Sequence, residues 1–365
     1  MASLALRDRD GVITKEGIIF RVFGYSHPAS EYVCDAEYAS ERIFTSYDPR
    51  APRKGSKGVF YKFYNDEGWK FVLNKYPRYN VFHEMLGQNI IGLNKKCIIE
   101  ARKPEKRLQK LIGKPPNDEL VDAMQRVLEE VLSRSGLSAT DFGVFGSLLH
   151  NFYHPKLSDI DLIVYGMRAN CKTRAALDTL YSDNQSSFRN EFENASAMEG
   201  KRWLFKNFTV NEFLWHQRRK QIYGLFHDFK TGRIIKAEFE PVKAWSEIKS
   251  EYDPKVRILR KDWVRIKARV IEDEEAPFIP SIYGIEPLEV LSGDQRAIEA
   301  VRVISYMEEF RQQAQKDEIV VVEGNLEEVV SPNSNWHQIA LTYCPRYYEQ
   351  MLKVANERRP IPFAS

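Results

Sequence analysis

The chain has 365 residues, of which 43% are apolar and 29% charged, and its formal net charge is +3. This composition excludes a disordered or fibrous protein and predicts a folded one with two or three domains. No apolar run approaches the ~20 residues that a bilayer-spanning helix needs, so we expect no such helix. The N-terminal sequence MASLALRDRDG lacks the apolar core of a secretory signal, and the four cysteines are scattered, so we expect a reducing, cytoplasmic setting without a disulfide framework or zinc site.

The first hundred residues combine β-branched and aromatic residues with turn residues, as in GVITKEGIIFRVFGYSHP and GVFYKFYNDEGWKFVL. This pattern predicts a β-rich domain over residues 1–100. Lys and Arg concentrate in residues 49–64 and 94–114, and the second stretch ends at Pro115-Pro116, which favours a linker. Basic clusters interleaved with Tyr and Phe can bind a phosphate backbone and stack on bases, with solvated surface segments as the alternative.

A helix is predicted next, because apolar residues recur at helical spacing behind a capping residue, Asn117 or Asp118, and Gly136 is placed to end it. The apolar stripe consists of Leu120, Val121, Met124, Val127, Leu128, Val131 and Leu132. Two short strands follow in DFGVFG and SDIDLIVYG, then a polar helix over 173–194 and a third strand over 232–242. We therefore expect an α+β domain over 115–248.

Strand patterns return in the last third of the chain, which predicts a β-rich α+β domain over 255–365. Within it, DQRAIEAVRVISYMEEFRQQA is expected to be a helix and EIVVVEG a strand.

Asp159 and Asp161 stand at the head of the apolar run LIVY. Apolar residues on both faces are typical of a central strand, and side chains two residues apart point the same way. Two carboxylates held together there repel and raise each other's pKa. A divalent cation would relieve this repulsion, and Mg²⁺ commonly takes one or two carboxylates together with substrate phosphates. A face open to solvent is the alternative.

Gly146-Ser147 ends the preceding strand and leads into a predicted helical turn. Such a turn exposes backbone N–H groups and a hydroxyl to an anion, and glycine removes the side chain that would block a phosphate. A phosphate-binding turn and a pair of metal ligands are therefore expected on consecutive strands.

This combination, Gly146-Ser147 followed by Asp159-x-Asp161, resembles the signature of the DNA polymerase β-like nucleotidyltransferase superfamily over residues 115–245, and SDIDLIVYG is similar to archaeal members. The resemblance implies a polymerase-β-like core of mixed sheet and helices, flanked here by β-rich domains. It implies that both aspartates hold Mg²⁺ or Mn²⁺, and that Ser147 and the amide after Gly146 hold a nucleoside triphosphate, for example ATP. The implied reaction transfers a nucleoside monophosphate to a hydroxyl and releases pyrophosphate.

The resemblance also implies a third carboxylate, which would bind metal and deprotonate the acceptor hydroxyl. RIIKAEFEPV offers Glu238 and Glu240 on one face, and Glu238 is favoured because apolar residues flank it on both sides. The family usually has Asp there. If neither glutamate reaches the metals, the domain would bind nucleotide without transferring it.

Many members carry Arg-Gly shortly after Gly-Ser, whereas this chain has LLHNFYH. His150 or His154 could replace that basic contact, with an ordinary loop histidine as the alternative. Lys172 and Arg174, just after the aspartate strand, are predicted to contact the nucleotide.

Other side chains have two readings each. Arg218, Arg219 and Lys220 could neutralise phosphates or form a solvated helix face. Tyr165 and Trp203 could stack on a base, although core packing is favoured for both.

The sequence thus predicts a Mg²⁺-dependent nucleotidyltransferase whose flanking domains recognise an acceptor, with tRNA or another RNA ahead of a protein or small molecule. A catalytically degenerate nucleotide- or RNA-binding module is the alternative. A glycosyltransferase could also use Asp-x-Asp with Mn²⁺, but the Gly-Ser one strand earlier argues against it.

Overall fold

The structure is a computed structural model that describes residues 5–55, 58–200 and 202–355. Its contacts divide the chain into two compact units. The first comprises residues 1–83, 87–188 and 225–252, and the second 84–86, 189–224 and 253–365. Six α-helices and three sheets lie within the described residues, which confirms the mixed α+β class. No helix in the described part of the chain is long and apolar enough to cross a bilayer.

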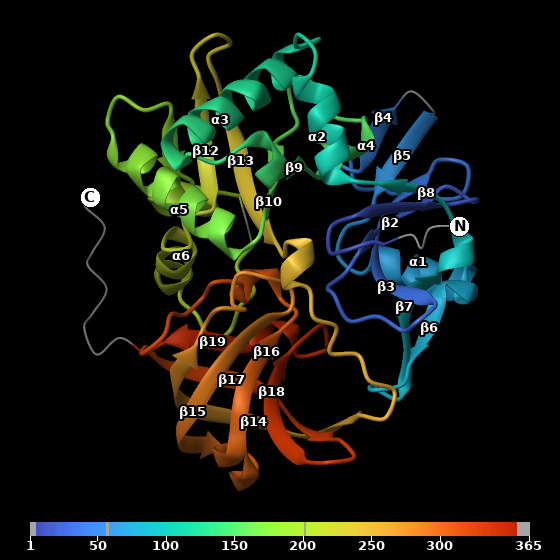
Figure 1. The fold of residues 1–365 in the computed structure, drawn as a ribbon, viewed down its shortest axis with the longest axis vertical. Coiled ribbons are helices and arrows are strands. Elements are labelled where there is room, and N and C mark those ends of the chain that lie inside the picture. The colour runs from blue at the N-terminus through green and yellow to red at the C-terminus, as the bar shows by residue number, and fades with distance from the viewer. Residues whose placement is uncertain (1–4, 56–57, 201, 356–365) are drawn as a thin grey trace. The chain divides into compact units, whose positions relative to one another are not determined.

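The first unit begins with a β-rich part, built as an eight-stranded sheet with the helix α1 (Glu67–Lys75) (Figure 1). Its main path runs β4-β5-β3-β2-β1-β8, while β7 pairs with β3 and β6 pairs with β7. The strands are β1 (Gly11–Thr14), β2 (Ile18–Val22), β3 (Glu31–Ser40), β4 (Pro52–Gly55), β5 (Gly58–Lys62), β6 (Asn80–His83), β7 (Gln88–Asn94) and β8 (Ile98–Arg102). Buried aliphatic and aromatic side chains of β1, β2, β3 and β7 form its core.

A second sheet has the order β11-β12-β13-β10-β9 and carries the two aspartates. Its strands are β9 (Phe142–Val144), β10 (Ile160–Tyr165), β11 (Phe188–Asn190), β12 (Tyr223–Asp228) and β13 (Arg233–Val242). The strand β10 pairs antiparallel with β9 and parallel with β13. Because β10 has neighbours on both edges and residues 162–165 are buried, the prediction of a central strand is confirmed.

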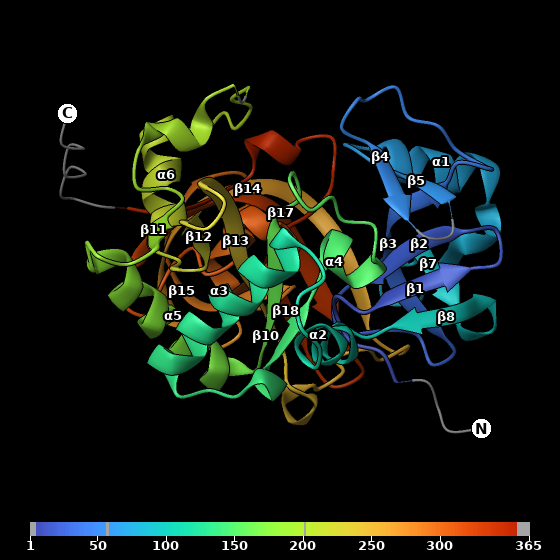
Figure 2. The same cartoon turned by 90° about the horizontal axis from the view of Figure 1, so that it is seen from above.

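Four helices accompany this sheet, and Figures 1 and 2 show α3 and α5 side by side over one of its faces. They are α2 (Pro104–Ile112), α3 (Glu119–Ser135), the short α4 (Gly146–His150) and α5 (Met167–Ser182). The polar helix predicted over 173–194 thus begins six residues earlier and ends at Ser182, and part of the remainder is β11. The polar sequence DNQSS after Ser182 ends the helix, since Asp183 and Asn184 favour turns.

The expected linker over 94–114 is wrong, because this segment holds β8 and α2. Lys96, Lys106, Lys110 and Lys114 are exposed, whereas both arginines of the segment are half-buried and bond to the fold. The Arg102 guanidinium donates to the His150 carbonyl (3.2 Å), and Arg107 Nε donates to the Leu148 carbonyl (3.1 Å). These bonds satisfy carbonyl groups at the C-terminal end of α4 that have no partner within the helix.

The helix α3 has the ends that the sequence predicts. The Asp118 carboxylate accepts hydrogen bonds from the backbone N–H groups of Leu120 and Val121, both at 3.0 Å. Gly136 follows the helix with φ +63°, a left-handed conformation that glycine adopts without strain. The Tyr153 hydroxyl also donates to Asp118 (2.7 Å), which ties the α4–β10 connection to this cap.

We expect Asp118→Ala to lower the free energy of unfolding by about 1–2 kcal/mol, because it removes both cap bonds and the tyrosine partner. Urea unfolding of the variant and the parent checks this. Asp118→Asn keeps an accepting oxygen and should lose much less, so equal losses in the two variants would contradict the capping role.

The second unit is built around a closed barrel. Its strands are β14 (Arg257–Glu272), β15 (Ser281–Ser292), β16 (Ala300–Ser305), β17 (Ile319–Val330) and β18 (Asn335–Leu341). They pair in the order β14-β15-β16-β18-β17, and β17 pairs again with β14, which closes the ring. Only the β16–β18 pair is parallel among these barrel pairs. A five-stranded Greek-key barrel of this kind is the architecture of OB-folds.

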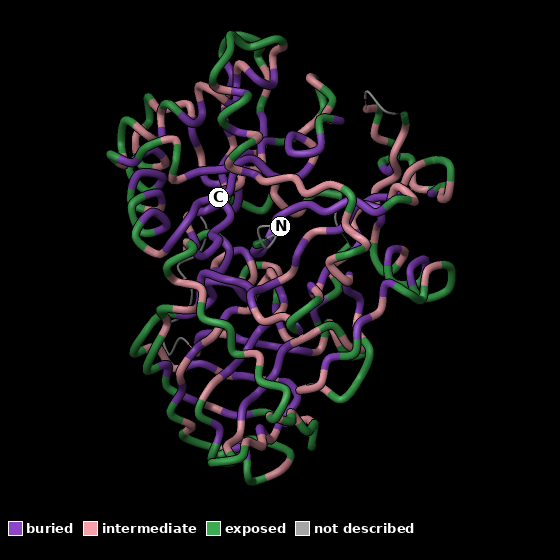
Figure 3. Tube along the Cα trace, turned by 45° about the vertical axis from the view of Figure 1, so that its right-hand side comes forward, coloured by how far each residue is buried: buried purple, intermediate pink, exposed green. Residues whose placement is uncertain are grey.

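Alternating burial fits this barrel. Figure 3 shows buried and exposed residues alternating along its strands, and the inner positions include Val264, Ile266, Ala268 and Val270 of β14. The short strand β19 (Met351–Val354) pairs with β17, and α6 (Val210–Arg218) also belongs to this unit. The helix predicted over 294–314 is wrong, because its centre is β16. The sequence AVRVIS is rich in β-branched residues and suits a strand between two partners.

Candidate functional site

The two aspartates lie at the amino end of β10. Asp159 precedes the strand and is exposed, while Asp161, its second residue, is half-buried. In the parallel pairing of β10 with β13, Asp161 lies opposite Glu238. Side chains opposite each other on paired strands project from the same face, so the sheet brings a carboxylate of β13 beside the aspartate pair.

The turn at Gly146 is built against Asp161. Gly146 has φ +56°, and a Cβ atom placed on it would collide with Oδ2 of Asp161. The Phe145 N–H donates to the Asp161 carbonyl (2.9 Å), which fixes the turn to the aspartate strand. Ser147, the next residue, is half-buried. The structure therefore brings together the two halves of the motif that the sequence separates by a loop.

We expect Gly146→Ala to disturb both stability and the aspartate site. The left-handed backbone costs an alanine about 1 kcal/mol, and the new methyl group must displace the Asp161 carboxylate as well. Nucleotidyl transfer should fall by at least ~10-fold, in accord with the sensitivity of reacting groups to shifts of about 1 Å. Thermal unfolding and transfer assays measure the two effects.

Gly136→Ala is the matched control, because Gly136 has φ +63° and nothing within 4 Å of an added Cβ. It should show the backbone cost alone. Equal stability loss and equal transfer in the two variants would show that the approach of Gly146 to Asp161 is irrelevant.

Asp161 lies in a strongly acidic environment. Burial raises its pKa to about 7, helped by the negative charges of Glu240 and Asp159 and, more weakly, of Glu37, while the Lys62 ammonium opposes the shift. A carboxyl group whose pKa is raised this far by burial and by neighbouring carboxylates is typical of functional sites.

The two glutamates of β13 differ in their partners. Glu240 is 7% exposed and forms an ion pair with Arg9 at 2.6 Å. Glu238 is half-buried and lies in register with Asp161. Arg9 itself is 2% exposed, and its guanidinium lies over the Phe145 ring at 5.2 Å. Arg9 could not be predicted from the sequence, because it lies 231 positions before Glu240 and belongs to no motif.

The histidines considered as substitutes for the missing arginine have other surroundings. His150 is 4% exposed and packs edge-on against Tyr38, with ring centroids 5.5 Å apart. Burial lowers its pKa. His154 is exposed, and its Nδ1 accepts a hydrogen bond from the Lys156 backbone (3.1 Å). His150 is thus part of the core, and His154 shapes the loop.

The remaining candidates are spread over the fold. Lys172 is exposed and Arg174 half-buried on α5, which begins beyond the carboxyl end of β10, so their contact with a nucleotide stays a prediction. Tyr165 is buried, with its hydroxyl donating to Glu105 (2.9 Å), and therefore packs in the core.

Two further candidates belong to the second unit, as core residues. Trp203 packs against Phe205 and Phe213 and donates to the Phe208 carbonyl (3.0 Å). Lys220 is fully buried beside Gln217 (2.9 Å), which rules out a solvated face at this position.

The donor set at β10 fits a hard divalent cation, since carboxylate oxygens are the ligands that Mg²⁺ and Mn²⁺ prefer. Among the residues that the structure describes, no three His, Cys, Asp or Glu side chains come close enough to form a metal cage by themselves. A site with one or two carboxylates is usually completed by substrate phosphates. The acidic surroundings of Asp161 and the close approach of the Gly146 backbone to its carboxylate agree with such a site.

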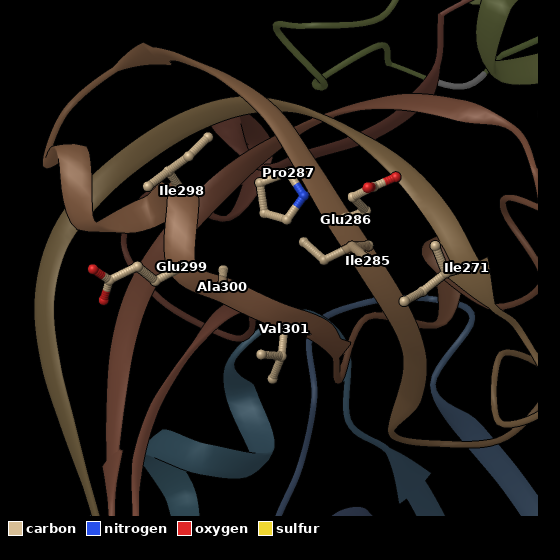
Figure 4. Close-up of a pocket in the computed structure, with 8 residues that line it drawn as sticks. All are labelled: Ile271, Ile285, Glu286, Pro287, Ile298, Glu299, Ala300 and Val301. Atoms are coloured by element: carbon tan, nitrogen blue, oxygen red, sulfur yellow. The ribbon is translucent and has the colours of Figure 1, made fainter.

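A separate pocket of about 440 Å³ lies on the barrel of the second unit (Figure 4). Its walls are largely aliphatic, with two carboxylates, and consist of Ile271, Ile285, Glu286, Pro287, Ile298, Glu299, Ala300 and Val301. This lining includes no basic side chain that could bind a phosphate, so the pocket lacks the chemistry expected for nucleotidyl transfer.

Comparison with known proteins agrees with the geometry. Residues 124–216 match the family model described as a nucleotidyltransferase domain, which confirms the resemblance and includes Gly146, Ser147, Asp159 and Asp161. Over 330 residues, 90% of this chain and 92% of the relative, the chain is 26% identical to the uncharacterized protein MJ1086 of Methanocaldococcus jannaschii. No solved structure matches the chain.

Proposed function

We propose that the protein transfers a nucleoside monophosphate from a nucleoside triphosphate to a hydroxyl acceptor, with Mg²⁺ or Mn²⁺ held at the amino end of β10. The observation that supports this most strongly is the packing of Gly146 against Asp161 inside the segment that matches a nucleotidyltransferase domain. A polymerase-β-like core is the fold expected for this chemistry, and a mixed sheet with the aspartate strand between two neighbours is compatible with it.

Each part of the site has a role in this proposal. Asp159, Asp161 and Glu238 would hold the metal together with substrate phosphates, and the metal would supply positive charge that offsets those phosphates. Ser147 and its backbone N–H bind the triphosphate. Glu238 accepts the proton of the acceptor hydroxyl, whose oxygen forms a bond to the α-phosphorus while the bond to pyrophosphate breaks.

The charge distribution indicates where a polyanionic acceptor such as RNA or tRNA would bind. Residues 1–115 contain 21 Lys or Arg against 13 Asp or Glu, whereas residues 253–355 contain 13 against 18. Nucleic acid binding depends largely on neutralising phosphates. The excess of positive charge therefore favours the N-terminal β-rich part over the barrel, although OB-type barrels often bind oligonucleotides.

The test is an assay of the purified protein with each of the four labelled nucleoside triphosphates and a total RNA pool, with Mg²⁺, with Mn²⁺ or with EDTA. We expect label to appear in RNA only when metal is present. Binding of nucleotide without transfer to RNA, protein or small molecules would instead support the catalytically degenerate module.

A further inference from the structure

The hairpin β4–β5 belongs to a basic segment that has no assigned role. Residues 49–64 contain five Lys or Arg and no Asp or Glu. The strands pair with Pro52 opposite Tyr61, Arg53 opposite Phe60 and Lys54 opposite Val59. Since residues alternate between faces, Arg53, Phe60 and Lys62 share one face, and Lys54 lies on the other.

The face with Phe60 and Lys62 is turned toward the nucleotidyltransferase domain. Phe60 stacks on Phe152, just after α4, with ring centroids 5.7 Å apart. Phe152 also packs against Tyr38 of β3 at 4.8 Å. Tyr38 lies opposite Lys62 in the β3–β5 pairing, so both side chains project from the same face.

This packing places Lys62 close to the candidate site. The helix α4, whose last residue His150 contacts Tyr38, begins at the Gly146 turn that touches Asp161. Lys62 is half-buried, and its amine lies over the Tyr64 ring at 5.7 Å. Among the described residues, Lys62 forms no ion pair.

We propose that Lys62, supplied by the β4–β5 hairpin, binds the phosphate chain of the nucleoside triphosphate at the Asp161 site. The inference rests on the proposed function and adds a residue to it. The loop LLHNFYH supplies no arginine, and the buried His150 cannot take its place. A flexible ammonium group is well suited to phosphate oxygens. The N-terminal β-rich part would thus complete the nucleotide site.

The test measures binding of nucleoside triphosphates and monophosphates by calorimetry, with Mg²⁺ present. Lys62→Ala should weaken triphosphate binding at least ~10-fold, with a much smaller effect on the monophosphate, and Lys62→Arg should restore most of it. Lys54→Ala is the matched control, because it removes the same charge from the opposite face of the same hairpin. If Lys62→Ala lowers the melting temperature, Lys62→Gln replaces it in the test, because glutamine retains much of the side-chain stem.

Unchanged triphosphate affinity in Lys62→Ala, or an equal loss in Lys54→Ala, would overturn the proposal. Unchanged triphosphate affinity with weaker binding of a single-stranded RNA oligonucleotide would overturn it too, and would assign Lys62 to the acceptor. Failure of the proposed function has a different result: the parent protein would bind triphosphate through Lys62 and yet transfer nothing.

Discussion

Replacing Asp159 and Asp161 together with Asn is expected to lower nucleotidyl transfer at least ~1,000-fold while the protein stays folded. Metal binding commonly supplies several kcal/mol of transition-state stabilisation, and both proposed metal ligands at the amino end of β10 lose their charge in this variant. Transfer of label from a nucleoside triphosphate, together with calorimetric titration of Mn²⁺, measures the two losses. Transfer that survives in the double variant would remove the catalytic assignment of this pair.

Asp161→Asn alone is expected to stabilise the folded protein, in contrast to its expected effect on transfer. Asp161 has a pKa near 7 in the folded protein and an ordinary pKa of about 4 when unfolded, so the folded state binds a proton more tightly. Metal-free protein should therefore lose stability as the pH rises from about 4 to 7, and remain at that lower level above pH 7. Asp161→Asn should escape this loss and gain on the order of 1 kcal/mol at pH 8, allowing for solvent screening of a side chain that is only partly buried.

Glu129→Gln on the exposed face of α3 is the control for loss of one negative charge. It should leave both transfer and the pH dependence of unfolding unchanged. A gain of stability in this control equal to that of Asp161→Asn would show that the effect reflects net charge and not the local acids.

Local patterns predicted the elements that hold the aspartates. The apolar stripe of α3, its Asp118 cap and its Gly136 end are all in the sequence, because helix period and capping chemistry act within a few residues. The strands β9, β10 and β13 were also predicted, since short apolar runs between turn residues suffice to identify them. The Gly146-Ser147 turn and Asp159-x-Asp161 follow each other on consecutive strands as expected.

Elements that depend on distant partners were not predicted. The sequence AVRVIS in β16 lies between charged residues whose spacing favours a helix, and its pairing with β18 involves residues more than 30 positions away. The basic segment 94–114 resembles a linker in sequence, but in the structure its arginines donate hydrogen bonds to carbonyl groups of α4. In both cases tertiary contacts decide the local structure.

The same limit applies to the site. Arg9 and Lys62 precede the aspartates by about a hundred residues or more and carry no motif, yet the fold places them beside Glu240 and in the electrostatic range of Asp161. A sequence motif identifies the residues that a family shares. It cannot identify side chains that another sheet brings close to the motif in the folded protein.

Glu238→Gln and Glu240→Gln are expected to differ in their effects, and the difference shows which glutamate is the third carboxylate of the site. Glu238 lies in register with Asp161, so its neutral variant should lose transfer by at least ~100-fold with little change in stability. Glu240 is buried in an ion pair with Arg9, so Glu240→Gln should retain much more transfer but lower the free energy of unfolding by up to about 3 kcal/mol, because it leaves the buried guanidinium with Asp8 at 3.7 Å in place of the closer Glu240 carboxylate.

Urea unfolding and transfer assays on both variants give the comparison. Arg9→Met completes it by removing the positive partner of the same ion pair. Arg9→Met should be destabilised to a similar degree, and it should also raise the pKa of Asp161, since it removes the positive charge that lies beside Glu240 near that aspartate. The reverse pattern, with transfer lost in Glu240→Gln and retained in Glu238→Gln, would make Glu240 the metal ligand. Arg9 would then be the group that holds it in place, and the N-terminal segment would act on the chemistry directly.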